Sequence, residues 1–460
     1  MSSSKPELVR DILPPVNRGM RTLDRDFFKR DVPLVAARVG DASYITKIGK
    51  EAKRDLLQLQ GVSRIVRFGE SENEKGILLR QDIKDPETVF DQISARSADL
   101  FREGKCTFEK YTLQLTYDYW RTEEILAAIL PEDLLDEIPS GFTNVGHIAH
   151  MNIREEYLPY RFLIGQVVLD KNSAMIRTVV NKLDSIDTVY RTFAMEVLAG
   201  EEDFMVEQSE SNCRFRFNFA KVYWNSRLHT EHSRLIDRFN KGEAVCDVFA
   251  GVGPFAVPAG KKGVIVLAND LNPDSYESLV ENIKLNKTGT FVHPSNKDGR
   301  KFIQESAKAL LDFKEERNGI VELLPRRMSR SKPTPSEKIS IPSTFNHYVM
   351  NLPDSAITFL DGFIGLYSAP GIQQQAFSGE PTQAQMPWIH VHCFHKCDPH
   401  QPEPPQEEIY EALRQRVNTA MRYDIPMSKL EFHKVRKVAP TKLMYCITFK
   451  LPLEVALKTQ

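Results

Sequence analysis

The residues with the clearest chemical potential lie in a glycine turn just past the middle of the chain. The segment reads Val245-Cys-Asp-Val-Phe-Ala-Gly-Val-Gly-Pro-Phe-Ala256, an apolar run that leads into the turn and then into helix-like sequence. Glycines at such a turn let a ligand approach the backbone closely. The stretch from Gly251 to Ala256 matches the dinucleotide pattern G-x-G-x-x-A, and Asp270 has the spacing of an acid that binds a ribose. A nicotinamide oxidoreductase is therefore one hypothesis.

Two residues beside the turn favour S-adenosylmethionine as the cofactor instead. Asp247 stands four residues before the first glycine, where its carboxylate would accept hydrogen bonds from an ammonium group and repel a pyrophosphate. Pro254 removes a backbone N–H donor that the phosphates of a dinucleotide would use. The turn therefore fits a cationic ligand better than an anionic one.

Three later stretches could supply the remaining polar groups of such a site. Asp270 ends an apolar run and would bind the two ribose hydroxyls of an adenosyl group. Asp298 and Gly299 follow in chain order, where they would hold the adenine. Asn351 begins an Asn-Leu-Pro sequence that resembles the motif by which many methyltransferases hold a nucleobase edge. Singly, the acids would be solvated loop residues and Asn351 a strand-end turn, so the prediction rests on their order.

The elements that must position these residues follow an alternating pattern from about residue 225 onward. Strand-like and helix-like stretches alternate there, as in a parallel sheet covered by helices. The strands are expected at residues 244–249, 263–269, 348–352, 388–394 and 445–451. The sequence thus predicts an α/β fold whose C-terminal domain, residues 225–460, is Rossmann-like. Two stretches interrupt the series: a Pro/Ser/basic insertion at 317–343, expected to be mobile, and a loop at 371–385.

Two smaller α/β domains are expected before it, at residues 1–110 and 111–224. The first carries strand-like runs at 32–39 and 63–68, and the second begins with helices near 121–130 and from Tyr157, with a loop at 141–150 between them. In residues 213–220 three phenylalanines alternate with polar residues, which is typical of a half-buried strand. A face that contacts phosphates is the alternative for its arginines.

Composition limits the partners and the compartment. The 61 lysines and arginines nearly balance the 62 acidic residues, so a nucleic-acid partner must bind a local patch. Six sparse cysteines fit a reducing compartment. No apolar run is long enough to cross a bilayer, so we expect no membrane partner. The N-terminus mixes hydroxyl and basic residues with acids, which leaves a mitochondrial transit peptide open.

A stretch rich in histidine and cysteine, Trp388 to His400, could suggest zinc. However, His390 and His392 alternate with apolar residues as on a strand, and the two cysteines have no second pair elsewhere. We therefore predict no metal site.

Several stretches together resemble the archaeal and eukaryotic tRNA (guanine-37-N1) methyltransferase family. They are Asn144–Ile153, Tyr190–Glu201, Val222–Leu235, and Asp247–Phe255 with the later Asn351-Leu-Pro. Leu13–Asp24 is similar to the start of eukaryotic members, and the chain is identified as a eukaryotic, fungal-type member of the family. The resemblance covers residues 140–300 and 345–362 well and leaves the basic insertion out.

The resemblance implies a monomeric enzyme in three parts. The N-terminal module would contact the outer corner of tRNA, the middle domain the anticodon stem-loop, and the C-terminal domain S-adenosylmethionine. The product would be 1-methylguanosine beside the anticodon, which supports reading-frame maintenance and begins wybutosine synthesis in phenylalanine tRNA. The family also implies a location in the mitochondrial matrix, the nucleus and the cytoplasm.

The chemistry requires a base at N1 of guanine, which carries a proton, and a donor at O6, where negative charge accumulates. The resemblance gives these roles to Glu231 and Arg191. The catalytic residues implied in this way are Glu231, Arg191 and Asn351. The cofactor-binding residues expected are His232, Asp247, Gly251, Gly253, Asp270, Leu271, Asp298, Gly299 and Asn351.

The residues alone leave alternatives open. Glu231 could be an ordinary first-turn residue after an N-cap at Thr230, favoured by the helix dipole, and Arg191 an exposed strand arginine. Tyr223, Trp224 and Pro353 could wall a pocket for the target base or belong to the core. A non-catalytic RNA-binding protein with a relic Rossmann domain is the remaining alternative to an enzyme.

Overall fold

The computed structural model describes residues 12–68, 74–186, 193–323 and 337–459 of the 460-residue chain. It divides into two compact units. The first comprises Met1–Phe142, Met151–Val180 and Val197–Gly200, and the second comprises Thr143–His150, Asn181–Glu196 and Glu201–Gln460.

The first unit begins with an antiparallel sheet in the order β2-β3-β1-β4. Helices α1 and α3 contribute fully buried side chains to its core, among them Ile48, Leu100 and Phe101. The two expected strands of this module are confirmed as β1 and β2. The elements are β1 (Arg30–Arg38), α1 (Ile45–Glu51), η3 (Lys53–Asp55), β2 (Ile65–Arg67), β3 (Lys75–Leu78), α2 (Val89–Gln92), α3 (Ala95–Glu103) and β4 (Thr107–Leu115).

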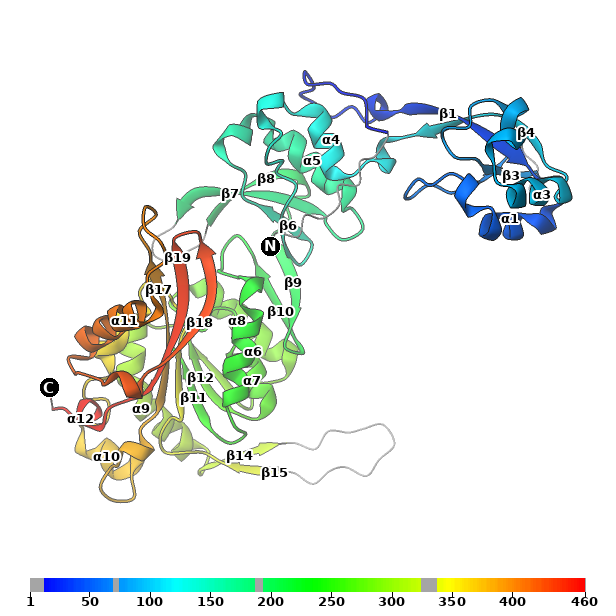
Figure 1. Cartoon of the computed structure of the whole chain (residues 1–460). Helices are drawn as coiled ribbons and strands as arrows, with labels where there is room; N and C mark the ends of the chain where they lie inside the picture. Colours follow the sequence, from blue (N-terminus) through cyan, green and yellow to red (C-terminus); the bar gives the residue numbers. More distant parts are fainter. Residues whose placement is uncertain (1–11, 69–73, 187–192, 324–336, 460) are drawn as a thin grey trace. The chain divides into compact units, whose positions relative to one another are not determined.

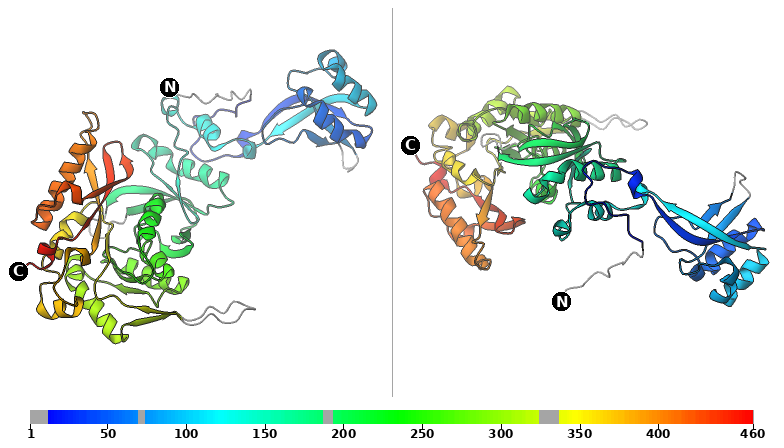
Figure 2. Two further views of the ribbon diagram at one scale, coloured as in Figure 1. Left: turned by 60° about the horizontal axis from the view of Figure 1, so that its bottom comes forward. Right: turned by 90° about the horizontal axis from the view of Figure 1, so that it is seen from above.

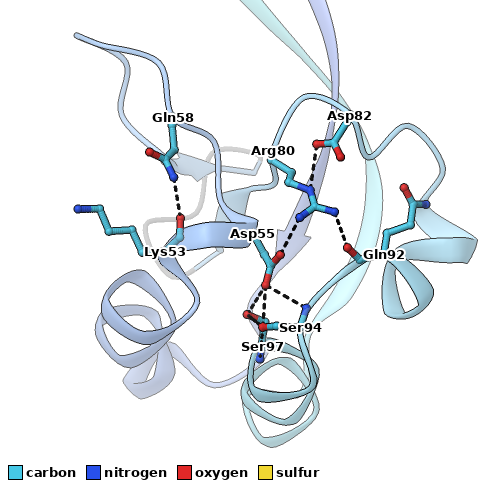
Figure 3. A network of polar contacts seen from close by, with 8 residues as sticks. All are labelled: Lys53, Asp55, Gln58, Arg80, Asp82, Gln92, Ser94 and Ser97. Atoms are coloured by element: carbon cyan, nitrogen blue, oxygen red, sulfur yellow. Dashed lines mark hydrogen bonds and ion pairs between the residues drawn. The ribbon is translucent and has the colours of Figure 1, made fainter.

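A buried polar network centred on Asp55 joins η3 to the start of α3 (Figure 3). Asp55 is only 3% exposed, and its carboxylate accepts hydrogen bonds from the hydroxyls of Ser94 and Ser97 at 2.8 and 2.7 Å. Arg80 donates to the same carboxylate at 3.0 Å and also to the carbonyl of Gln92. Burial alone would raise the pKa of Asp55, but the serine hydrogen bonds and the Arg80 charge outweigh burial and lower it.

We expect Asp55→Ala to destabilise this module by about 3 kcal/mol, because Arg80 would lose its buried counterion and the hydroxyls of Ser94 and the buried Ser97 would lose their acceptor. Hydrogen exchange of the backbone amides of β1 and β4 measures the change locally. Asp82→Ala is the matched control, since Asp82 contacts the same guanidinium at 2.9 Å but its side chain is 67% exposed. Equal exchange protection in Asp55→Ala and Asp82→Ala would contradict the prediction.

The next part of the chain contains the two expected helices and a short hairpin where a loop was predicted. The loop prediction at 141–150 is wrong, because β5 and β6 pair antiparallel there. The strands β5 to β8 form a four-stranded sheet in that order. The elements are α4 (Thr122–Ile129), β5 (Thr143–Val145), β6 (Ile148–Met151), α5 (Arg161–Lys171), β7 (Thr178–Ile186) and β8 (Phe193–Gly200).

In the second unit, a hairpin of β9 (Met205–Glu210) and β10 (Cys213–Asn218) precedes the main sheet. Phe215 and Phe217 are buried, whereas Arg214 and Arg216 are exposed, which confirms the half-buried strand. The two arginines pair with carboxylates of Glu207 and Glu281, at 3.3 and 3.4 Å. These pairs favour the structural interpretation over a phosphate-binding face.

The main sheet has seven strands in the order β13-β12-β11-β16-β17-β19-β18. β13, β12, β11, β16 and β17 pair in parallel in that order, whereas β19 runs antiparallel to β17 and to β18. All five expected strands and the Rossmann-like class are confirmed, and β13 and β18 are additional. The strands are β11 (Ala244–Asp247), β12 (Ile265–Asn269), β13 (Val292–Ser295), β16 (His347–Met350), β17 (Trp388–Lys396), β18 (Glu431–Ala439) and β19 (Lys442–Lys450).

Helices cover both faces of this sheet, α6, α7 and α8 on one face and α9 and α11 on the other (Figures 1 and 2). β11, β12, β16 and β19 are therefore largely buried on both faces, which explains their mostly apolar sequences, whereas β18 at the edge is exposed. The helices are α6 (His229–Arg238), α7 (Ala256–Lys262), α8 (Pro273–Asn286), α9 (Gly299–Glu316), α10 (Pro370–Ala376), α11 (Gln406–Met421) and α12 (Leu453–Ala456).

The two expected interruptions are more regular than predicted. The insertion is anchored by an antiparallel pair, β14 (Ile320–Leu323) and β15 (Glu337–Ser340), because Val321 and Ile339 bury their side chains. Residues 324–336, which hold most of its basic run, lie outside the described residues. The loop predicted at 371–385 contains most of α10 and the short helix η10 (Gln383–Gln385).

The expected domain boundaries can be compared with these elements. A boundary at residue 110 falls inside β4, which pairs with β1 along its whole length. The unit with the seven-stranded sheet comprises Thr143–His150, Asn181–Glu196 and Glu201–Gln460, whereas the expected domain is 225–460. The three functional domains remain a prediction. Within the described ranges, no helix combines the length and the apolar character needed to cross a membrane.

Candidate active site

The glycine turn lies between β11 and α7, as the sequence predicts. Gly251 and Gly253 have φ angles of +53° and +99°, in the left-handed region that favours glycine. A Cβ atom at Gly253 would lie 2.8 Å from side-chain carbons of Leu279 and Val257, whereas one at Gly251 would meet nothing within 4 Å. The space beside Gly251 is therefore open to a ligand.

Asp247, the last residue of β11, is fully buried. Neither of its carboxylate oxygens has a hydrogen-bond partner among the described residues. Burial, reinforced by the charge of Asp270, raises the pKa of Asp247 to about 8. A buried, unpartnered carboxyl is costly, and an ammonium group placed against it would remove that cost. Asp247 therefore fits the amino-acid end of S-adenosylmethionine.

This pKa predicts a pH-dependent affinity for S-adenosylhomocysteine. Below about pH 8 the carboxyl is protonated in the free protein and must lose its proton to pair with the ligand's ammonium group. The affinity should therefore rise with pH, by up to about tenfold per unit between pH 6 and 8. Calorimetry across this range measures it, and Asp247→Asn should show a weaker, flat profile. A flat profile in the unchanged protein would refute the assignment.

Asp270 follows β12 and holds the glycine turn in place. Its Oδ2 accepts a hydrogen bond from the backbone N–H of Gly251 at 2.8 Å, and its Oδ1 accepts one from Asn272 at 2.9 Å. Burial raises the pKa of Asp270, and these two hydrogen bonds partly offset the effect. Each carboxylate oxygen keeps a second lone pair, so the side chain can still accept hydrogen bonds from ribose hydroxyls.

Asn351 comes directly after β16, and its Oδ1 is buried without a partner among the described residues. Because β11 lies between β12 and β16 in the sheet, Asp247, Asp270 and Asn351 end three adjacent strands. Parallel strands of such sheets bind ligands at their carboxyl ends. The open turn and the unpartnered oxygens of Asp247 and Asn351 together fit the adenosyl cofactor.

The other residues expected to bind the cofactor are Leu271, Asp298, Gly299 and His232. Leu271 is 46% exposed. Asp298 is the N-cap of α9 and accepts hydrogen bonds from two backbone N–H groups of its first turn, and Gly299 is the first residue of that helix. His232 is buried, with its Nδ1 2.5 Å from a carboxylate oxygen of Glu210. Contacts of these residues with a cofactor remain predictions.

Glu231 is the third residue of α6 and is 2% exposed. Leu228, not Thr230, is the N-cap of this helix, and the carboxylate lies in a buried polar cluster rather than in solvent. Arg234 donates from Nε and Nη2 at 2.6 and 2.7 Å, and His392 Nε2 lies 2.8 Å from Oε1. Burial would raise the pKa of Glu231, but these two partners outweigh it and lower the pKa to about 2.

The sequence does not predict the partners of Glu231. His392 lies on β17, opposite Cys446 of β19, and both side chains are fully buried. Burial lowers the pKa of His392, but Cys446 and Glu231 outweigh it and raise the pKa to about 10. His433 of β18 places Nε2 3.5 Å from Oε2 of Glu231. The only sequence signal was that His392, like His390, alternates with apolar residues on a strand.

Glu231, His392 and Cys446 also form the one group, among the described residues, whose ligand atoms are close enough to hold a metal ion. The Arg234 guanidinium bound to the same carboxylate disfavours a cation there. We propose no metal for this cluster.

The structure gives different results for the other residues that the sequence suggested as substrate contacts. Arg191 lies outside the described residues. Trp224 is a core residue, 8% exposed, with its ring centroid 5.5 and 5.0 Å from those of Phe215 and Phe217. Tyr223, by contrast, is 46% exposed. Of the predicted walls for a target base, Trp224 is therefore better explained by packing.

Comparison with known proteins identifies the family to which this chain belongs. Residues 122–203 match the TYW2 N-terminal domain, and residues 206–312 match the TRM5/TYW2 methyltransferase domain. The tRNA (guanine(37)-N(1))-methyltransferase of Candida albicans (strain WO-1) is 46% identical over 457 residues, which cover 97% of this chain and 98% of the relative. The enzyme of that name from Schizosaccharomyces pombe is 49% identical, with 94% of each chain covered. This chain belongs to the tRNA (guanine(37)-N(1))-methyltransferase family.

Among solved structures, that of wild-type Trm5b from Pyrococcus abyssi is similar to this chain with a TM-score of 0.54 at 23% identity. The alignment covers 91% of this chain and 99% of the archaeal one, which supports the shared fold. Family membership confirms the predicted resemblance and removes the nicotinamide oxidoreductase and the non-catalytic binding protein as main hypotheses. The match from residue 206 includes the β9–β10 hairpin in the methyltransferase domain.

Proposed function

We propose that this protein transfers the methyl group of S-adenosylmethionine to N1 of guanosine 37 in tRNA. S-adenosylmethionine supplies an electrophilic methyl group when bound. The proposal rests on the carboxyl-terminal edge of the parallel strands, where Asp247, the open turn at Gly251 and Asn351 lie together. Buried oxygens without partners there match a ligand with an ammonium group and a purine. The near full-length relatives with this name give the target base.

Glu231 is proposed as the base that removes the N1 proton of guanine, with Arg191 as the donor to O6. The carboxylate is buried and, with a pKa of about 2, it is a weak base in the free protein. Most of its lone pairs accept hydrogen bonds from Arg234 and His392, and the open position is on Oε2, beside His433. For Glu231 to act as the base, the substrate must displace Arg234, and His392 then keeps the carboxylate oriented.

A methylation assay tests the proposal directly. Unmodified tRNA should accept a methyl group from labelled S-adenosylmethionine, and the same tRNA with guanosine 37 replaced by adenosine should not. Equal labelling of both tRNAs, or of neither, would refute the assignment of the target base.

Three finer expectations belong to the same proposal. The product serves reading-frame maintenance and begins wybutosine synthesis in phenylalanine tRNA, the enzyme acts as a monomer, and it binds the anticodon stem-loop and outer corner of tRNA. A location in the mitochondrial matrix, nucleus and cytoplasm is also proposed from the family resemblance. Light scattering tests the monomer, and footprinting of bound tRNA tests the two contact regions.

A further inference from the structure

Strand β18 contains a bulge that decides where Arg436 lies. His433 lies opposite Cys446 and Arg436 opposite Met444, so three steps along β18 match two along β19. Neighbouring residues on a strand alternate between faces, and a bulge shifts that alternation by one residue. Arg436 therefore shares the face of His433. Without the bulge it would share the face of Lys434.

The face of His433 and Arg436 is the face beside Glu231. His433 is 3.5 Å from the Glu231 carboxylate and its side chain is 46% exposed, so this part of β18 borders the candidate base site and reaches the surface. Arg227 belongs to the short helix η8 (Ser226–Leu228), four residues before Glu231 in the chain, and its charge acts on Arg436. Its guanidinium donates to the hydroxyl of Thr143 at 3.2 Å, which fixes its position.

The two arginines share a positive region that the described residues do not neutralise. No ion pair with a carboxylate involves Arg227 or Arg436 in the described parts of the chain. Burial and the charge of Arg227 lower the pKa of Arg436, as expected for like charges held together. On the other face of β18, by contrast, Lys434 and Lys437 lie 2.9 and 3.8 Å from carboxylate oxygens of Glu403.

An unneutralised arginine pair is suited to a phosphate, because each guanidinium can donate two parallel hydrogen bonds to its oxygens. A base that is drawn out of its stack to reach a buried carboxylate brings its own backbone phosphates close to the surface residues around that carboxylate. Contacts to such phosphates position the RNA without reading its sequence. We propose that Arg227 and Arg436 bind one backbone phosphate of the RNA beside the target guanosine. This inference rests on the proposed function.

The test measures binding of unmodified tRNA in the presence of S-adenosylhomocysteine, as a function of salt. Arg436→Gln and Arg227→Gln should each weaken binding about tenfold. Each should also make the slope of log affinity against log salt shallower by about one unit, and by the same amount on tRNA with adenosine at position 37. Lys434→Gln is the matched control, with the same charge change on the same strand, and should alter affinity less than twofold.

Two further measurements, tRNA binding by Arg436→Lys and the affinity of each variant for S-adenosylhomocysteine, distinguish a lost phosphate contact from misfolding. Arg436→Lys keeps the charge but loses the planar fork, so it should retain the salt slope and recover only part of the affinity. Unchanged affinity for S-adenosylhomocysteine shows that each variant is folded. Arginine variants that bind tRNA like Lys434→Gln would overturn the phosphate site. A protein that binds tRNA through these arginines but does not methylate guanosine 37 would overturn the proposed function and leave the phosphate site standing.

Discussion

Glu231→Gln is expected to slow methyl transfer to tRNA by about a hundred- to ten-thousand-fold, the usual contribution of a general base. The amide cannot accept the proton that leaves N1 of guanine. Affinity for S-adenosylhomocysteine should be retained, because the carboxylate contacts Arg234 and His392 rather than the glycine turn. Single-turnover kinetics with saturating tRNA measure the rate, and calorimetry measures the cofactor affinity.

The control for this variant must separate lost chemistry from lost stability. Removing the Glu231 charge leaves Arg234 and His392 without a counterion, which is destabilising in a buried site. Glu243→Gln makes the same change in a second carboxylate and histidine pair, with His347 at 3.4 Å, at the opposite end of β11. If both variants lose similar stability but only Glu231→Gln loses its methyl-transfer rate, the result supports Glu231 as the general base. Near-normal turnover of Glu231→Gln would exclude it.

The sequence predicted the parallel part of the main sheet well, because strands covered on both faces are short apolar runs with clear ends. β18 was missed for a physical reason. At the edge of the sheet it carries charged residues on both faces, and its bulges break the alternation that identifies a half-buried strand. β13, with four residues that include Pro294, gave too short a pattern.

In the candidate site, too, the sequence predicted residues at the ends of neighbouring strands but not contacts between residues far apart in the chain. Asp247, Gly251 and Asp270 could be placed together from the sequence, because the carboxyl ends of adjacent parallel strands meet at one edge. The partners of Glu231 could not, since Arg234 looks like an ordinary helix residue and His392 is 161 positions away in the chain. The alternation in β17 was predicted correctly. Alternation alone, however, does not show that the face with His392 is buried against α6.

Asp270→Ala is expected to lower the affinity for S-adenosylhomocysteine by at least about 100-fold. Two effects act together. The variant loses a charged acceptor for the ribose hydroxyls, worth about 1.5–3 kcal/mol per hydrogen bond, and it releases the Gly251 amide that fixes the turn. Calorimetry measures the affinity. Asp274→Asn is the matched control, since the side chain of that acid in the first turn of α8 is 39% exposed and its ion pair among the described residues is with Lys221.

The pH profile of the same variant distinguishes a specific role from general damage to the turn. The Asp270 charge helps to raise the pKa of Asp247 to about 8, after burial as the larger cause. Removing that charge lowers the pKa of Asp247, so the residual affinity should reach its plateau at a lower pH than in the unchanged protein. A misfolded turn would weaken binding at every pH without moving the plateau. An unmoved plateau would therefore show that the two carboxylates do not share one electrostatic site.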